Sequence, residues 1–275
     1  MTERETVPVV GGPFTFPMIT DPADLRLDDF RSLIDADVRP DRRGIVIAEG
    51  VNVVERLTRS TYQIKAIVGV ESKLTALGPS LAGVQAPVYC VDKWTLSEVV
   101  GFRVTRGILA AAERPAAVDP KCLIAAGQRF VVLEAINDFE NLGSIFRNAA
   151  AFGLDGVLLD PRCADPLYRR SVRVSMGHVF AMPFAVLMDP WPESLRTLQS
   201  AGVRLLALTP RSEASALRSV AAGDRWAVLL GAEGPGLSDA ALNAADELVR
   251  IPMAKGVDSL NVATAGAVAF ASLVT

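Results

Sequence analysis

The sequence has little of what metal and thiol chemistry need. Its 275 residues include a single histidine, His178, which excludes a histidine-rich metal site and leaves one residue available for any Ser-His-Asp triad. The three cysteines, Cys90, Cys122 and Cys163, lie far apart and form no Cys-x-x-Cys pair. Scattered cysteines supply no zinc framework and are typical of a reducing cytosol. We therefore expect no metal.

Long apolar runs and a basic, apolar leader are missing too. No apolar run reaches the roughly 20 residues that span a membrane. The first residues, with Glu3, Arg4 and Glu5 followed by Gly-Gly-Pro, do not resemble a signal peptide. We expect a soluble, cytoplasmic protein that does not contact a membrane.

Positive charge is not in excess. The formal net charge is −3, which argues against a protein that coats nucleic acid. An enzyme can still hold RNA through a local basic patch on an acidic body. Two arginine groups are candidates, Arg42 with Arg43, and Arg169 with Arg170 and Arg173. A solvated arginine face is an equally good interpretation of each.

What the sequence does have is enough apolar material for two domains. Half of the residues are apolar, and the length exceeds that of a usual single domain. The positions of proline and glycine, which favour turns and loops, predict a leader over residues 1–20 and a small α/β unit over 21–114. A linker at 115–128 and a second α/β unit at 129–275 follow.

Short apolar strands separated by helical stretches define these units. The expected strands are Gly44–Ala48, Lys65–Val70, Pro87–Val91, Phe130–Ile136, Gly156–Asp160, Phe184–Leu187, Val203–Leu208, Trp226–Gly231 and Leu248–Ile251. The expected helices are Pro22–Asp35, Val51–Thr58, Thr95–Val100, Leu142–Phe152, Leu167–Met176, Pro192–Ser200, Asp239–Ala244 and one from Leu260 onward. The second unit should hold a mostly parallel sheet covered on both faces, with its ligand beyond the carboxyl ends of the strands.

A first segment with functional character, Asn137–Ala149, directly follows an expected strand. Asp138 or Asn141 could simply cap the helix that begins there. Capping does not explain Arg147, because an arginine in a weakly polar helix needs a partner such as a phosphate or a carboxylate. Arg147 is therefore a candidate functional residue.

A second segment is glycine-rich and follows the strand Trp226–Gly231. Glycines 231, 234 and 236 let the backbone approach a ligand closely, although a tight turn alone would also use them. The segment has no lysine, and Glu233 would repel a polyphosphate. A glutamate suits a cationic or hydroxyl-bearing ligand better, and S-adenosylmethionine is both.

A third segment, Ile251–Val262, precedes the last helix. Pro252 could end a strand, and Ser259 could cap that helix. The helix itself is rich in small residues, which permits close packing within the chain or between subunits.

Together the three segments resemble the SpoU (TrmH) branch of the SPOUT methyltransferases. The family pattern is Asn-x-Gly-x-x-x-Arg, then Gly-x-Glu-x-x-Gly-Leu, then Ile-Pro-Met followed by Ser-Leu-Asn. This sequence carries all three in order, at Asn141–Arg147, Gly231–Leu237 and Ile251–Asn261. The N-terminal unit also resembles the family's small L30e-like RNA-binding domain, in Gly44–Gly50 and Val104–Gly107.

The resemblance implies an S-adenosylmethionine-dependent RNA 2′-O-ribose methyltransferase. It implies an α/β fold with a C-terminal trefoil-knotted SPOUT domain, an L30e-like N-terminal domain, and a homodimer whose site is completed across subunits. Ribosomal RNA is the first choice of substrate, since the N-terminal domain resembles those used on structured ribosomal RNA. Transfer RNA is the alternative.

The resemblance also assigns roles to residues. The catalytic group comprises Arg147, Asn141, Glu233 and Asn261, with Arg147 acting on the ribose hydroxyl or its neighbouring phosphate. Because arginine has a pKa above ~12, an electrostatic role suits it better than that of a base. The cofactor-binding set comprises Gly231, Ile251, Met253, Ser259 and Leu260. The candidate RNA contacts are Arg42, Arg43 and Arg106.

Two other interpretations remain open. One is an RNA-binding protein that has lost catalysis and keeps the fold. The other is an α/β enzyme for a different nucleotide, which the glycine turn alone suggests. The joint presence of the four catalytic candidates favours the methyltransferase.

Overall fold

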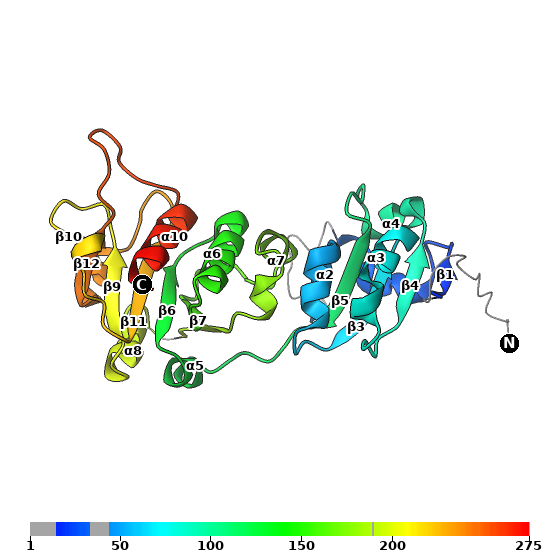
Figure 1. Ribbon diagram of the computed structural model, residues 1–275, viewed down its shortest axis with the longest axis horizontal. Coiled ribbons are helices and arrows are strands. Elements are labelled where there is room, and N and C mark those ends of the chain that lie inside the picture. The colour runs from blue at the N-terminus through cyan, green and yellow to red at the C-terminus, as the bar shows by residue number, and fades with distance from the viewer. Residues whose placement is uncertain (1–14, 34–43, 189, 275) are drawn as a thin grey trace. The chain divides into compact units, whose positions relative to one another are not determined.

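The computed structural model describes residues 15–33, 44–188 and 190–274. The chain divides into two compact units (Figure 1). Unit 1 comprises residues 1–115 with 167–181, and unit 2 comprises residues 116–166 with 182–275. Both are α/β, as the sequence predicts. No described helix has the length and apolar character needed to cross a membrane.

Unit 1 contains a mixed sheet whose described strands lie in the order β1-β4-β3-β5-β2. β5 runs antiparallel to β2 and β3, whereas β4 runs parallel to β1 and β3. The strands are β1 (Met18–Ile19), β2 (Ile45–Glu49), β3 (Ile64–Gly69), β4 (Val88–Val91) and β5 (Ile108–Glu113). The helices are η1 (Leu25–Phe30), α2 (Val51–Thr58), α3 (Glu71–Leu81), α4 (Lys93–Val100), α7 (Arg169–Val174) and η2 (His178–Phe180).

Helix α7 folds with unit 1 although its sequence lies between strands of unit 2. Arg169 Nη1 lies 2.9 Å from Glu49 Oε2 at the end of β2, and the two side chains are 9% and 4% exposed. Arg56 on α2 also donates to the carbonyl of Met176. A buried charge is costly unless it is paired, so the ion pair requires that α7 and β2 stay together.

Unit 2 is built on a sheet in which all paired strands are parallel, in the order β10-β12-β9-β11-β6-β7-β8. The strands are β6 (Arg129–Glu134), β7 (Gly156–Leu159), β8 (Phe184–Val186), β9 (Arg204–Leu208), β10 (Ser215–Ala216), β11 (Trp226–Gly231) and β12 (Glu247–Arg250). The helices are α5 (Pro120–Ala126), α6 (Phe139–Ala151), η3 (Glu193–Leu195), α8 (Arg196–Ser200), η4 (Leu217–Ser219), α9 (Asp239–Ala244) and α10 (Val262–Leu273).

Helices cover both faces of this sheet, as predicted. Phe130 and Val132 of β6 pack in one core cluster with side chains of α5, α8 and α9. On the opposite face α6 and α10 lie side by side (Figure 1). α10 approaches β11 closely because it carries glycine at 266, where a Cβ would lie 3.0 Å from Leu230 Cδ1. The small residues of the last helix thus serve a tight crossing within the chain.

Candidate functional site

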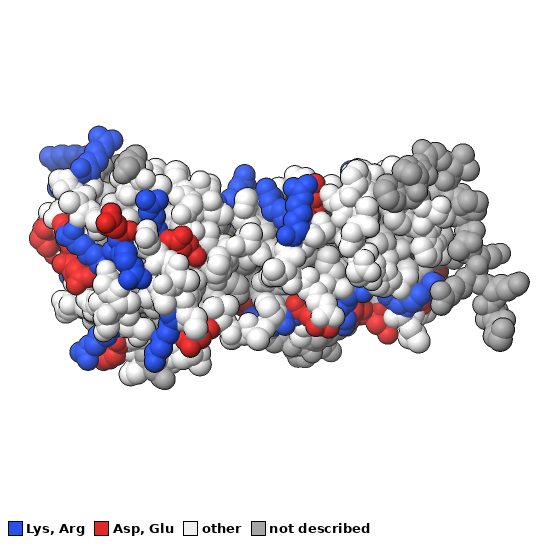
Figure 2. Space-filling view, turned by 60° about the horizontal axis from the view of Figure 1, so that its bottom comes forward, with Lys and Arg blue, Asp and Glu red and all other residues white. Residues whose placement is uncertain are grey.

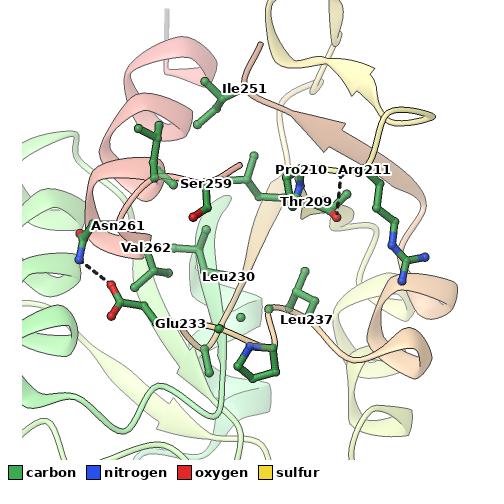
Figure 3. A pocket seen from close by; sticks show the side chains of 18 of the residues that line it. Thr209, Pro210, Arg211, Leu230, Glu233, Leu237, Ile251, Ser259, Asn261 and Val262 are labelled. Carbon is green, nitrogen blue, oxygen red and sulfur yellow. Dashed lines mark hydrogen bonds between the residues drawn. The ribbon is translucent and has the colours of Figure 1, made fainter. Parts of the chain in front are cut away.

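A pocket of about 680 Å³ opens beyond the carboxyl ends of β9, β11 and β12. One wall is the glycine turn after β11, and another is the segment between β12 and α10 (Figure 3). All five predicted cofactor-binding residues line it: Gly231, Ile251, Met253, Ser259 and Leu260. Parallel α/β sheets bind ligands at this edge.

The glycine turn folds back on the end of β11. Ala232 and Gly236 form an isolated bridge, with Gly236 N donating to Ala232 O at 2.9 Å. A Cβ on Gly231 would overlap backbone atoms of Gly236 and Leu237. Gly234 and Gly236 have φ of +88° and +71°, a region that favours glycine. The backbone thus requires glycine at the mouth of the pocket.

The three sequence segments meet at one side chain. Asn261 Nδ2 donates to Asn141 Oδ1 and to Glu233 Oε1, both at 2.7 Å (Figure 3 shows the bond to Glu233). Its Oδ1 accepts the N–H of Ala263 at 3.0 Å, so Asn261 is the N-cap of α10. The alternative that Ser259 only caps this helix is thus excluded, because Asn261 is the cap. Three of the four predicted catalytic residues are therefore in direct contact.

Arg147 lies apart from this group. Asp138 caps α6, and Asn141, 8% exposed, faces Asn261 from its first turn. A helix turns about 100° per residue, so Arg147, six residues on, points roughly 120° away from Asn141. Arg147 is exposed, and its side chain makes no hydrogen bond or ion pair with any described residue. Because its side chain is exposed, water can solvate the guanidinium, and the structure does not require a partner for it.

Glu134, at the end of β6, is a site residue that the sequence interpretation missed. Its side chain is 3% exposed, and it accepts hydrogen bonds from three segments. The donors are Ser238 N at 2.8 Å, Trp191 Nε1 at 2.6 Å and Arg162 Nη2 at 3.0 Å. An acid that ends an apolar strand just before a functional segment is a signal that could have found it.

Asp160 and Cys163 extend this network after β7. Asp160 Oδ1 accepts the N–H of Ala135 at 3.1 Å, and its Oδ2 accepts Arg162 Nε at 2.7 Å. That hydrogen bond raises the pKa of Arg162. Burial, together with the nearby Asp160 charge, raises the pKa of the Cys163 thiol to about 12. The thiol stays protonated at neutral pH and is not a nucleophile.

The residues after β9 form a pocket wall that was also missed. Thr209, Pro210 and Arg211 line the pocket, and Arg211 pairs with Asp239 at the start of α9. They follow an expected parallel strand, so the strand-end rule could have found them. Among the described residues, no group of three or more His, Cys, Asp or Glu could hold a metal ion.

Arg106, the one predicted RNA contact that the structure describes, does not line this pocket. Arg42 and Arg43 lie outside the described residues. Arg106 is exposed in unit 1, where its Cδ would lie 3.0 Å from a Cβ placed on Gly50. Arg106 therefore sits beside the end of β2, the strand whose last residue, Glu49, binds α7.

Comparison with known proteins gives consistent results. Residues 128–271 match the model of the SpoU rRNA Methylase family. A tRNA/rRNA methyltransferase of Mycobacterium bovis, named as uncharacterized, is 50% identical over 258 residues, which cover 92% of this chain and 89% of that protein. The 23S rRNA (guanosine(2553)-2′-O)-methyltransferase of Bacillus subtilis is 27% identical over 222 residues, covering 81% of this chain and 85% of that protein.

A solved structure supports the same fold. An AdoMet-bound rRNA methyltransferase from Sinorhizobium meliloti superimposes with a TM-score of 0.75 at 25% identity. The match covers 93% of this chain and 96% of that one, so it includes both units.

Proposed function

The chain belongs to the SpoU rRNA methylase family, and on that premise we propose that it transfers a methyl group from S-adenosylmethionine to a ribose 2′-hydroxyl of ribosomal RNA. The Bacillus subtilis relative is named for this chemistry on 23S rRNA, and the similar Sinorhizobium meliloti structure holds AdoMet. Transfer RNA is the alternative acceptor, since the mycobacterial relative is named for both RNAs.

The observation that carries the proposal is the contact of three distant segments at Asn261. One amide joins Asn141, at the start of α6, to Glu233 in the glycine turn. Helix capping needs only the amide oxygen of Asn261, so it leaves both donated bonds unexplained. Holding cofactor and acceptor in one geometry does require that these segments be fixed together.

The pocket residues fit S-adenosylmethionine. The volume of about 680 Å³ falls within the roughly 300–1,000 Å³ of small-molecule sites. Ile251, Met253 and Leu260 offer apolar surface to an adenine ring, and the bare backbone at Gly231 allows close approach. The Glu233 carboxylate favours a cationic ligand.

Methyl transfer forms a C–O bond, breaks a C–S bond and releases the hydroxyl proton. S-adenosylmethionine supplies the methyl group as an electrophile, so the protein must mainly position the hydroxyl and favour loss of its proton. We assign Arg147 to the acceptor side, where its permanent charge would bind the neighbouring phosphate or orient the hydroxyl. Asn141, Glu233 and Asn261 would hold the cofactor side.

A homodimer would reconcile the exposed Arg147 with this role. In one chain Arg147 points away from Asn141, so we propose that the site is completed across subunits. Thr264, Val268 and Ala271 form an exposed stripe of small and apolar residues on α10, and Val268 is 38% exposed. We propose that this stripe contributes to the dimer contact. From the family resemblance we also propose a trefoil knot in unit 2 and a cytoplasmic location.

In unit 1 we propose a phosphate-binding surface around Arg106. Arg169 and Arg173 both pair with Glu49, at 2.9 and 3.4 Å, and Arg173 remains 32% exposed, while Arg106 and Arg170 are exposed. Four arginines thus lie on or beside α7 and the end of β2 in a chain of net charge −3. Figure 2 shows Lys and Arg side chains gathered around the α7 region. A local positive surface of this kind attracts the RNA backbone.

Isothermal calorimetry tests the proposal. The protein should bind S-adenosylmethionine, and neither ATP nor NAD. Absence of S-adenosylmethionine binding would contradict the proposal. Binding of ATP or NAD in its place would favour the alternative of an α/β enzyme that uses a different nucleotide. A protein that binds the cofactor but methylates no RNA would be the RNA-binding scaffold without catalysis.

A further inference from the structure

Glu134 is a buried acid that lies outside the three sequence segments that carry the family resemblance. Its two carboxylate oxygens accept three hydrogen bonds, from Ser238 N, Trp191 Nε1 and Arg162 Nη2. Burying a carboxylate is costly unless such donors satisfy it. The donors come from three separate parts of unit 2, so the carboxylate fixes their relative positions.

The bond to Ser238 bears directly on the pocket. Ser238 follows the glycine turn and caps α9, and its neighbour Leu237 lines the pocket. On the other side of Glu134, the chain continues within a few residues to Asp138, the N-cap of the helix that carries Asn141. Glu134 thus connects the residue after the glycine turn, through a hydrogen bond, to the chain segment that leads into α6.

Ion pairing alone does not account for this arrangement. The side chain of Arg162 is 57% exposed, and it already lies 2.6 Å from Asp160. An arginine so exposed could be satisfied without Glu134. The N–H of Ser238 belongs to the backbone that joins the glycine turn to α9, so its bond to Glu134 bears on the position of the turn itself.

We propose that Glu134 is a positioning residue for methyl transfer. Its carboxylate holds the end of the glycine turn at the distance from the Asn141 segment that S-adenosylmethionine binding requires. This inference rests on the proposed function. Glu134 acts through the backbone and touches neither cofactor nor RNA.

A matched pair of variants tests the contact between Ser238 N and Glu134. Ser238 has φ of −64°, which proline also adopts. Ser238→Pro therefore replaces the N–H by a ring carbon, which removes the bond and displaces the Glu134 carboxylate, and it also removes the capping hydroxyl, whereas Ser238→Ala removes the hydroxyl alone. We expect Ser238→Pro to bind S-adenosylmethionine roughly tenfold more weakly than Ser238→Ala in calorimetry, the effect of about one buried hydrogen bond.

A second pair tests the same point from the acid. In Glu134→Gln the side-chain NH₂ must face a donor, either the N–H of Ser238 or the Trp191 and Arg162 groups. The variant should lose affinity for S-adenosylmethionine, and adding Trp191→Phe should recover part of it by removing one of the competing donors. If Glu134→Gln alone does not fold, the affinity of the double variant Glu134→Gln, Trp191→Phe for S-adenosylmethionine is measured in its place.

Asp155→Asn controls for stability. Its carboxylate accepts the backbone N–H groups of Gln128 and Arg129, at 2.8 and 2.9 Å, before β6 and at its start. The Asp155→Asn variant should have a lower thermal midpoint and an unchanged affinity for S-adenosylmethionine. Equal affinities of Ser238→Pro and Ser238→Ala, or an equal loss in Asp155→Asn and Glu134→Gln, would overturn the inference. A wild-type protein that fails to bind S-adenosylmethionine would instead contradict the proposed function.

Discussion

At the scale of single residues, Gly231 is the position where the backbone tolerates no side chain. The Cβ of Gly231→Ala would overlap the returning turn, so the turn must shift. We expect S-adenosylmethionine binding to fall by at least tenfold and the thermal midpoint to drop. Gly83→Ala is the control, since a Cβ there meets no atom within 4 Å. Wild-type cofactor affinity in Gly231→Ala would contradict the placement of the cofactor at this turn.

Arg147 is the residue on which catalysis is expected to depend. Arg147→Ala should lower the rate of methyl transfer by roughly 100-fold or more, because one preorganised charge contributes about that much to a transition state. The affinity for S-adenosylmethionine should stay near the wild-type value, since Arg147 does not line the pocket. Arg196→Ala, an exposed arginine on α8, is the control. Survival of activity in Arg147→Ala would show that its role is wrongly assigned.

At the scale of elements, Asn261 caps α10 with its amide oxygen and joins Asn141 to Glu233 with its amide nitrogen. Two substitutions separate these roles. Asn261→Asp keeps an acceptor for the N-cap of α10, but it cannot donate to Asn141 and it repels Glu233. Asn261→Ala removes both duties, and loss of a cap costs about 1 kcal/mol. We expect both variants to lose cofactor affinity in calorimetry. In thermal unfolding, only Asn261→Ala should lose the stability that the cap contributes. An unchanged affinity of Asn261→Asp for S-adenosylmethionine would contradict a role of the contact with Asn141 and Glu233 in cofactor binding.

Elements with clear local signals were predictable from sequence. The bounds of α2, β11 and α9 agree with the predicted ranges, because apolar spacing and adjacent turn or capping residues mark them. Helix α3 was missed because Gly78 and Pro79 interrupt its pattern. β5 was missed because Ala110–Ala112 have low strand propensity and form a strand only through pairing with β2 and β3.

The site was predictable as segments but not as contacts. Each motif could be found along the chain, yet the meeting of Asn141, Glu233 and Asn261 depends on how three loops cross in space. Ser259 and Asn261 are both plausible caps by residue type, and only the backbone geometry selects Asn261. The attachment of α7 to unit 1 depends on a pairing with Glu49 across 120 residues of sequence.

At the scale of the whole molecule, the proposed dimer makes activity depend on assembly. Val268→Arg places a charge in the exposed stripe of α10, where burial against a partner would be costly. Sedimentation should give a dimer for the wild-type protein and a monomer for Val268→Arg, which should also lose methyl transfer. A fully active monomeric wild-type protein would contradict a site completed across subunits.

RNA binding should depend on salt through unit 1. Each phosphate contact removed should make the slope of log affinity against log salt shallower by about 0.7–0.9. Arg106→Ala and Arg173→Ala should each lower RNA affinity in this way and leave S-adenosylmethionine binding intact. Arg26→Ala is the control, because Arg26 lies on η1, outside the proposed surface. An unchanged slope in both test variants would remove this surface from the RNA interface.

Nucleoside analysis of RNA treated with the protein and labelled S-adenosylmethionine tests the central claim most directly. The wild-type protein should place the label on a 2′-O-methyl ribose, at a defined position in ribosomal RNA, and Arg147→Ala should not. Label on a base, or no label on any cellular RNA despite cofactor binding, would contradict the assignment of ribose 2′-O-methyl transfer to this site.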